Sequence, residues 1–156
     1  MASRILVPYD GSYSSDKAVR QTIELVKSLS KNAEIILFHV VPEIHLQANY
    51  IRGMRISYVK SAYQHRREIY QLTRIHALDM LNIKKDEFKD AGINNVESRV
   101  SIGNPVKLIL ALASTEKVNL IVIGSVGLSG MARLKAVGSV SRGVSERAKC
   151  PVLIVH

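Results

Sequence analysis

The sequence contains one cysteine, no tryptophan and four prolines among its 156 residues. With Cys150 as the sole cysteine, an internal disulfide and a cysteine-based metal cage are excluded. Cys150 stands directly before Pro151 and an apolar run, a context that favours a small packing residue over a reactive thiol. This cysteine usage fits a reducing compartment.

Long apolar runs are also missing. The longest, such as residues 35–41, fall far short of the roughly 20 residues that cross a bilayer. The first strand-like run begins at Arg4, which leaves no room for a secretory signal. We therefore expect a soluble, cytoplasmic protein with no membrane partner, and the length favours a single domain over residues 1–156.

Acidic residues are scarce, with 13 against 22 lysines and arginines and a formal net charge of +9. This charge favours anionic partners such as nucleotides or nucleic acid. Much of it lies within residues 52–89, where Tyr58, Tyr63 and Tyr70 are interleaved with arginines. A solvated helix face with packed tyrosines explains this segment more simply than a nucleic-acid interface does. Nucleic-acid binding is therefore the third functional hypothesis.

Five short runs rich in Ile, Val and Leu indicate strands buried on both faces, because they are continuous rather than alternating. They cover residues 4–8, 34–41, 96–102, 119–124 and 151–156. Helical patterns lie between them at residues 16–29, 58–91, 105–117 and 139–148, and residues 42–57 form a long loop. The alternation predicts a three-layer α/β fold, in which helices cover both faces of an open, twisted, five-stranded parallel sheet.

Local signals support the helix boundaries. Ser14 and Ser15 can cap the first helix, and Asn104 followed by Pro105 opens the third. The second helix carries a stripe that we expect to pack, and we also expect His39 and His76 to be packing residues. The stripe consists of Ala62, Ile69, Leu72, His76, Met80, Ile83 and Phe88.

Ligands of parallel sheets bind beyond the carboxyl ends of the strands. After the fourth strand come Gly124, Gly127 and Gly130, and then Gly138 and Ser139 at the start of the last helix. Spaced glycines and a helix N-terminus can surround a phosphate, although the same residues could simply make a turn and a helix start. Asp10, at the end of the first strand, could bind ribose hydroxyls or cap the first helix.

Catalytic motifs are absent from the sequence. It has no GxSxG elbow, no Walker GxxxxGK[ST] and no tight histidine spacing for a metal. A phosphoacceptor role for Asp10, as in response-regulator receivers, is disfavoured because Asp10 stands alone and the third strand ends at Ile102 and Gly103. We therefore expect no catalytic residues, no metal site, and binding with slow or absent hydrolysis.

The order of several motifs resembles the universal stress protein family over the whole chain. These motifs are Ile5-Leu6-Val7-Pro8-Tyr9-Asp10-Gly11-Ser12, Leu37-Phe38-His39-Val40, Gly103-Asn104-Pro105, Gly124-Ser125-Val126-Gly127, Gly138-Ser139-Val140 and Cys150-Pro151-Val152-Leu153-Ile154-Val155. The resemblance implies a Rossmann-like sheet with strand order 3-2-1-4-5, of the type found in adenine nucleotide alpha hydrolases. It also implies a homodimer that pairs through the last strand, from Pro151 to His156, and such an uncovered apolar strand invites pairing.

In the ATP-binding branch of that family, the matching positions imply a nucleotide site, with Mg²⁺ as a candidate accompanying ion. Main chain around Pro8, Tyr9 and Val40 would contact adenine, and Asp10 would hold ribose. Phosphate-binding positions would be Gly124, Gly127, Gly138, Ser139 and Val140, with Gly130 in the same loop.

The chain departs from that branch in one respect. Residues 128–137 form a spacer of ten between Gly127 and Gly138, where the branch has nine. The first hypothesis is thus an ATP-binding regulatory protein of the stress response, and the second is a dimeric interaction module of the same family that binds no nucleotide.

Overall fold

The computed structural model describes residues 3–29, 32–43, 56–127 and 137–156. Its strands are β1 (Ser3–Pro8), β2 (Ala33–Val41), β3 (Val96–Ile102), β4 (Leu120–Gly124) and β5 (Val152–Val155). Its helices are α1 (Tyr13–Leu29), α3 (Ile56–Asp90), α4 (Pro105–Thr115) and α5 (Ser139–Arg147). Most of the predicted 42–57 loop falls outside the described residues.

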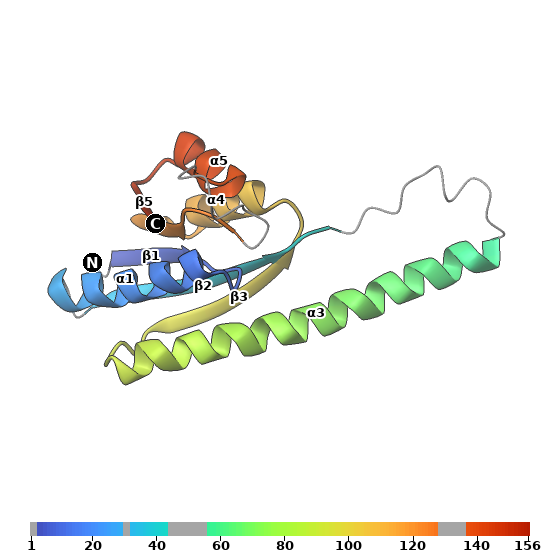
Figure 1. Ribbon diagram of the computed structural model, residues 1–156, viewed down its shortest axis with the longest axis horizontal. Coiled ribbons are helices and arrows are strands. Elements are labelled where there is room, and N and C mark those ends of the chain that lie inside the picture. Colours follow the sequence, from blue (N-terminus) through green and yellow to red (C-terminus); the bar gives the residue numbers. More distant parts are fainter. Residues whose placement is uncertain (1–2, 30–31, 44–55, 128–136) are drawn as a thin grey trace.

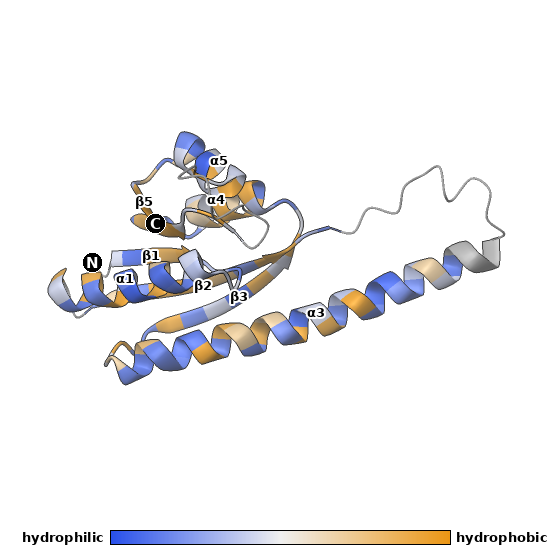
Figure 2. Cartoon of the chain, in the orientation of Figure 1, coloured by the Kyte–Doolittle hydropathy of each residue, from blue (hydrophilic) through white to orange (hydrophobic). Residues whose placement is uncertain are grey.

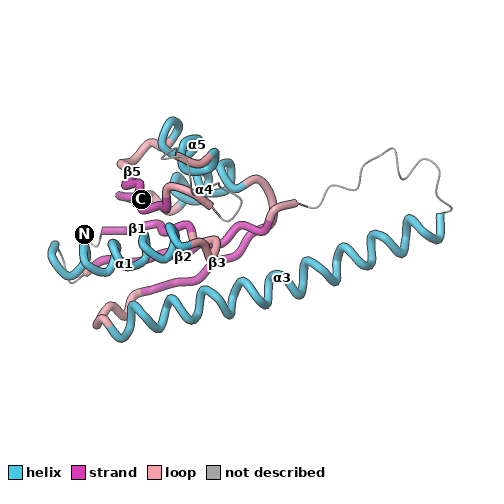
Figure 3. The backbone as a smooth tube through the Cα atoms, in the orientation of Figure 1, coloured by secondary structure: helices cyan, strands magenta, loops and turns pink. Residues whose placement is uncertain are grey.

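The sheet confirms the predicted topology. All strand pairs are parallel and the order is β3-β2-β1-β4-β5. Figures 1 and 3 show β1, β2 and β3 beside one another, with β5 on the other side of β1. The chain builds outward from β1 through β2 to β3, and then returns to the other side of β1 for β4 and β5. The direction therefore switches between β1 and β4, where the connections leave a crevice beyond the carboxyl ends of the strands.

Two apolar cores lie on opposite faces of the sheet, because successive strand residues point to opposite faces. Ile5 and Val7 of β1 join the core under α1 and α3, whereas Leu6 joins the core under α4 and α5. In Figure 2 the inner strands carry long apolar stretches, whereas the edge strand β3, with the sequence VESRVSI, mixes apolar and polar residues. This double burial explains why the sequence runs are continuous rather than alternating.

Helix α1 begins at Tyr13, three residues before the predicted start. Ser12, rather than Ser14 or Ser15, caps it: the Ser12 hydroxyl accepts a hydrogen bond from the Ser15 amide at 3.2 Å. The predicted cap of α4 is confirmed, since Asn104 Oδ1 accepts a bond from the Lys107 amide at 3.0 Å.

Helix α3 is 35 residues long and only its C-terminal part lies on the sheet, whereas its N-terminal part extends past the strands (Figure 1). The predicted stripe was right for Phe88, which is buried, and for Met80, which packs against the core. It was wrong for Leu72, Ile83 and His76: Leu72 is 68% exposed, Ile83 is 62% exposed and His76 is exposed. The buried face is formed by Ala77, Leu81 and Phe88. The expected packing of tyrosines was also wrong for Tyr63, which is exposed and stacks with Arg66.

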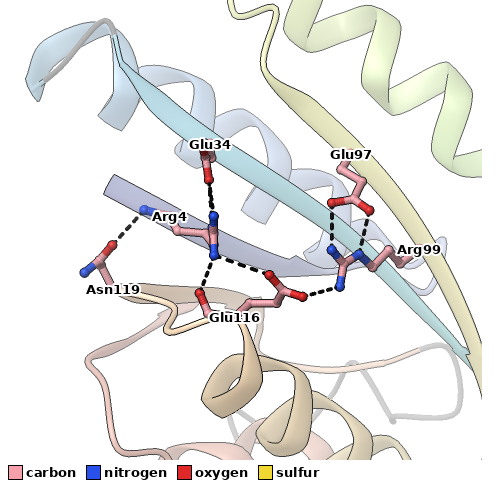
Figure 4. A network of polar contacts seen from close by, with 6 residues as sticks. All are labelled: Arg4, Glu34, Glu97, Arg99, Glu116 and Asn119. Carbon is pink, nitrogen blue, oxygen red and sulfur yellow. Dashed lines mark hydrogen bonds and ion pairs between the residues drawn. The ribbon is translucent and has the colours of Figure 1, made fainter. Parts of the chain in front are cut away.

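The end of α4 is tied to three strands by a polar network (Figure 4). The Glu116 carboxylate lies 2.7 Å from Arg99 of β3 and 3.3 Å from Arg4 of β1. Arg4 also pairs with Glu34 of β2 at 2.7 Å. This network fixes α4, whose other end faces the crevice. None of the described helices is both long and apolar enough to span a membrane.

Candidate functional site

A cavity of about 600 Å³ lies beyond the carboxyl ends of β1, β2 and β4, and we call it the strand-end cavity. Its volume is in the range of small-ligand sites. Nine of the ten predicted binding residues line it. They are Pro8, Tyr9, Asp10, Val40, Gly124, Gly127, Gly138, Ser139 and Val140. The tenth, Gly130, lies outside the described residues.

The Asp10 carboxylate lies against the backbone of Gly127. A Cβ added to Gly127 would be only 2.8 Å from Asp10 Oδ2, so no other residue fits without movement. Asp10 Oδ1 accepts a hydrogen bond from the Ser12 amide at 2.9 Å, which holds the carboxylate in place. Asp10 therefore supports the start of α1 and also faces the glycine loop.

The first turn of α1 fixes the loop after β4. A Cβ on Gly124 would lie 2.6 Å from the backbone carbon of Ser14, so only glycine permits this close approach. The Ser14 hydroxyl donates to the Val126 carbonyl and also lies 3.3 Å from the Val126 amide. The loop is thus held against α1 by backbone contact and hydrogen bonding.

Helix α5 begins at this cavity with Gly138 as its N-cap, and among the described residues no side-chain cap bond is formed. Within that part of the chain its first amides have no capping side chain, and Ser139 and Val140 line the cavity. A helix N-terminus of this kind attracts anions through free N–H groups and the positive end of the dipole.

The longer spacer does not separate the two glycine segments. The Gly138 amide donates to the Ser125 carbonyl at 2.6 Å, and the Ser141 hydroxyl donates to the same carbonyl at 2.8 Å. Gly138 and Gly127 consequently line one cavity.

The other side of the cavity is formed by the ends of β1 and β2. The Tyr9 amide donates to the Phe38 carbonyl at 2.8 Å, and His39 Nδ1 donates to the Tyr9 carbonyl at 2.7 Å. Phe38, Val40 and Ile109 add apolar surface. The expectation that His39 is only a packing residue was incomplete, because it is half-buried, lines the cavity and fixes the Tyr9 backbone.

Several residues that line the cavity, or that hold its loop in place without lining it, were not predicted as site residues. Ser14 and Ser141 were not predicted, because their contacts join segments far apart in the sequence. Pro105 and Ile109 of α4 also reach the cavity. A signal existed for His39 and Pro105, since both stand in segments at the carboxyl ends of strands, which the topology rule selects.

A second cavity, of about 460 Å³, lies at the opposite ends of α4 and α5. Lys117, Arg147 and Lys149 line it. Both helices end there, so these cations complement the negative ends of two helix dipoles. Cys150 also lines this cavity, and burial raises the pKa of its thiol, in keeping with a packing role.

The described residues contain no group of three or more histidine, cysteine or carboxylate side chains that could hold a metal. The strand-end cavity therefore combines an apolar side, one fixed carboxylate and an amide-rich side built from glycines and a helix start. Such an arrangement suits a small molecule with an apolar ring, hydroxyl groups and an anionic end.

A model of the universal stress protein family matches residues 1–156. The chain belongs to this family. It is 34% identical over 156 residues to the universal stress protein YxiE of Bacillus subtilis, with all of both chains covered.

Solved structures of other universal stress proteins share the fold. The structure of MJ0577, from Methanocaldococcus jannaschii, superposes with a TM-score of 0.80 at 27% identity, covering 99% of this chain and 96% of the other. A universal stress protein in complex with cAMP superposes with a TM-score of 0.61 at 30% identity, covering 99% and 96%.

Proposed function

We propose that this universal stress protein binds ATP in the strand-end cavity as a regulatory ligand of the stress response, with slow or no hydrolysis. The observation that carries the proposal is the uncapped start of α5, which lies across the same cavity from the fixed Asp10 carboxylate. A relative at 30% identity has been solved with cAMP, an adenine nucleotide.

Each part of the cavity has a role in this proposal. The apolar end at Val40 and the Tyr9 main chain would receive adenine, and Asp10 would accept hydrogen bonds from ribose. Phosphates would lie against Gly127 and the first amides of α5. Mg²⁺ could accompany them there, coordinated by phosphate oxygens. Gly127 fits this role because any side chain would occupy the space beside Asp10.

Slow hydrolysis follows from the side chains that are present. Asp10 and His39 are titratable side chains that line the cavity. Asp10 is assigned to ribose, and His39 already donates its Nδ1 proton to the Tyr9 carbonyl. In this proposal Asp10 is engaged with ribose and His39 lies beside the Tyr9 main chain, which would receive adenine, so neither side chain is assigned to activating water beside the phosphates.

Equilibrium binding of labelled ATP tests the proposal. Wild type is expected to bind saturably, and Gly127→Val should weaken binding at least about tenfold because its side chain would meet Asp10. Gly138→Val should do the same, since its Cβ would lie 3.1 Å from the Ser125 carbonyl oxygen. Gly92→Asn is the control: it sits at a positive φ with open space around it, outside the cavity.

Two results would contradict the proposal. If wild type fails to bind ATP, AMP and cAMP at millimolar concentrations, the chain is better described as a dimeric interaction module. If the purified protein turns over ATP rapidly in the presence of a metal ion, the assignment as a binding protein is wrong.

A further inference from the structure

Helix α3 carries a lysine on its buried face. Ala77, Leu81 and Phe88 are buried on this face, and Lys84 falls on the same stripe. The Lys84 side chain is only 15% exposed. A lysine in such a position destabilises a fold unless its ammonium is paired, so its partners explain its presence.

The partners of Lys84 come mainly from the segment that carries Asp10. Its ammonium lies 2.7 Å from the Asp16 carboxylate and 5.5 Å from the centre of the Tyr9 ring. The Tyr9 hydroxyl donates to the same carboxylate at 2.7 Å. Its remaining partner, Glu87 at 2.7 Å, belongs to α3 itself. The lysine thus connects α3 to the end of β1 and the first turn of α1.

The titration of these groups strengthens the connection. Burial and the hydrogen bond to Asp16 raise the pKa of Tyr9 to about 12, so the phenol stays neutral. Burial is the largest influence and opposes the charges of Lys84 and Asp16. The bonds of Lys84 to Asp16 and Glu87 together outweigh burial and raise the pKa of the lysine. The bonds that Asp16 receives from Lys84 and Tyr9 likewise lower the pKa of the aspartate. All three groups therefore keep the forms that bind one another at neutral pH.

Tyr9 belongs to the cavity and to this cluster at the same time. Its main chain is held by Phe38 and His39 at the cavity, whereas its side chain lies in the core under α3. A second contact lies one turn earlier on α3, where Met80 Sδ would be 3.0 Å from a Cβ on Gly11. Helix α3 therefore contacts the residues on both sides of Asp10.

We propose that Lys84 is a positioning residue for the nucleotide site, and that through Lys84 and Tyr9 the site is coupled to α3. The inference rests on the proposed nucleotide binding and adds a route for its regulation. Coupling is reciprocal, so if Lys84 affects the affinity for nucleotide, bound nucleotide should in turn stabilise the part of α3 around Lys84.

Equilibrium binding of ATP to full-length Lys84→Met tests the positioning role. The affinity should fall about fivefold or more, the lower end of typical coupling effects. Lys84→Arg keeps the charge and should restore part of the affinity. The matched control is Lys89→Met, which removes another lysine of α3. Lys89 also pairs with a carboxylate three residues away, Asp86 at 3.4 Å, but its ion pair involves no residue of the 9–16 segment.

Hydrogen exchange tests the coupling with a readout that simple destabilisation does not reproduce. ATP should slow amide exchange in residues 77–88 of wild type and of K89M, but not of K84M. Tyr9→Phe removes the hydroxyl and keeps the ring, so its loss of affinity should be less than additive with that of K84M, since both act through Asp16. If K84M does not fold, Y9F takes its place in both experiments.

The outcomes separate this inference from the proposed function. Failure of wild type to bind ATP contradicts both. ATP binding by wild type with unchanged affinity in K84M and Y9F contradicts the positioning role alone. Binding without any change in the exchange of residues 77–88 contradicts the coupling.

Discussion

The Asp16 carboxylate receives hydrogen bonds from Tyr9 and Lys84. Burial opposes its charge, but the bonds from Lys84 and Tyr9 outweigh burial and hold its pKa below the usual value of 3.8. The unfolded chain therefore takes up this proton at a higher pH than the folded chain does. The stabilisation is present above about pH 4 and is lost as the pH falls through the lowered pKa.

Asp16→Asn should reduce stability by about 1 kcal/mol at pH 7, because the variant lacks the charge-assisted bonds at every pH. The difference should shrink as the pH falls towards the lowered pKa of Asp16, because wild type then loses the same bonds. Urea denaturation at pH 7, 5, 4 and 3 measures the difference. Asp90→Asn, at the exposed end of α3, serves as the control. A difference between wild type and D16N that does not shrink on acidification would refute this account.

At the scale of single residues, much of the site could be predicted. Asp10, Gly124 and Gly138 stand at strand ends and a helix start, positions that the topology of a parallel sheet brings together. The role of Lys84 could not be predicted, since a lysine in a basic helix gives no sign that it is buried or that it meets Asp16, far away in the sequence. Whether these residues bind ATP stays a prediction.

The loop from α4 to β4 joins several elements through one side chain, Glu116. Its carboxylate accepts from Arg4 and Arg99, and its carbonyl accepts from Arg4 at 2.6 Å. The Glu116 side chain is 23% exposed, so these bonds are partly screened from water. The contacts therefore hold α4 to the outer half of the sheet (Figure 4).

Glu116→Gln should lower the free energy of unfolding by about 1 kcal/mol, because it removes the acceptor charge between two arginines. Urea denaturation compares it with Glu146→Gln, an exposed residue of α5. The loss should shrink in high salt. Equal stability of the two variants would mean that the network contributes nothing beyond ordinary surface pairs.

Helix α3 shows where pattern reasoning fails at the scale of elements. Its existence and its ends were predicted closely, but a single stripe was fitted to a helix that contacts the sheet over only part of its length. The true buried face uses the small Ala77 and the long Lys84, neither of which marks a hydrophobic stripe. Helices α4 and α5 posed no such problem, because they are short and lie on the sheet.

At the scale of the whole molecule, β5 forms one edge of the sheet and β3 the other. The carbonyls of Pro151 and Val155 point towards β4, where they accept hydrogen bonds from the amides of Ile121 and Ser125. Residues alternate in direction along a strand, so the backbone groups of Val152 and Ile154 point to the open edge. Such an edge can pair with a second copy, which is why we expect a homodimer through β5.

Sedimentation velocity should find dimers of wild type at micromolar concentration. Leu153→Lys should weaken the dimer by about tenfold or more, because it places a charge on a strand that pairs between copies. The matched control is Ile102→Lys, which places the same charge on the opposite edge at a residue of similar exposure, 42% against 37%. Monomeric wild type, or equal weakening by both variants, would contradict pairing through β5.

The two bonds to the Ser125 carbonyl have an evolutionary consequence. They close the segment between Gly127 and Gly138 at its base, whatever its length. Doubling the number of residues between two joined points of a chain costs only about 0.6 kcal/mol of closure entropy, so we expect insertions or deletions between these two glycines to be nearly neutral for folding. Relatives that keep glycines at the positions of Gly127 and Gly138, and a serine at the position of Ser141, should therefore tolerate changes in the number of residues between the two glycines. The length of this spacer is consequently a poor criterion for assigning a relative to the ATP-binding branch of the family.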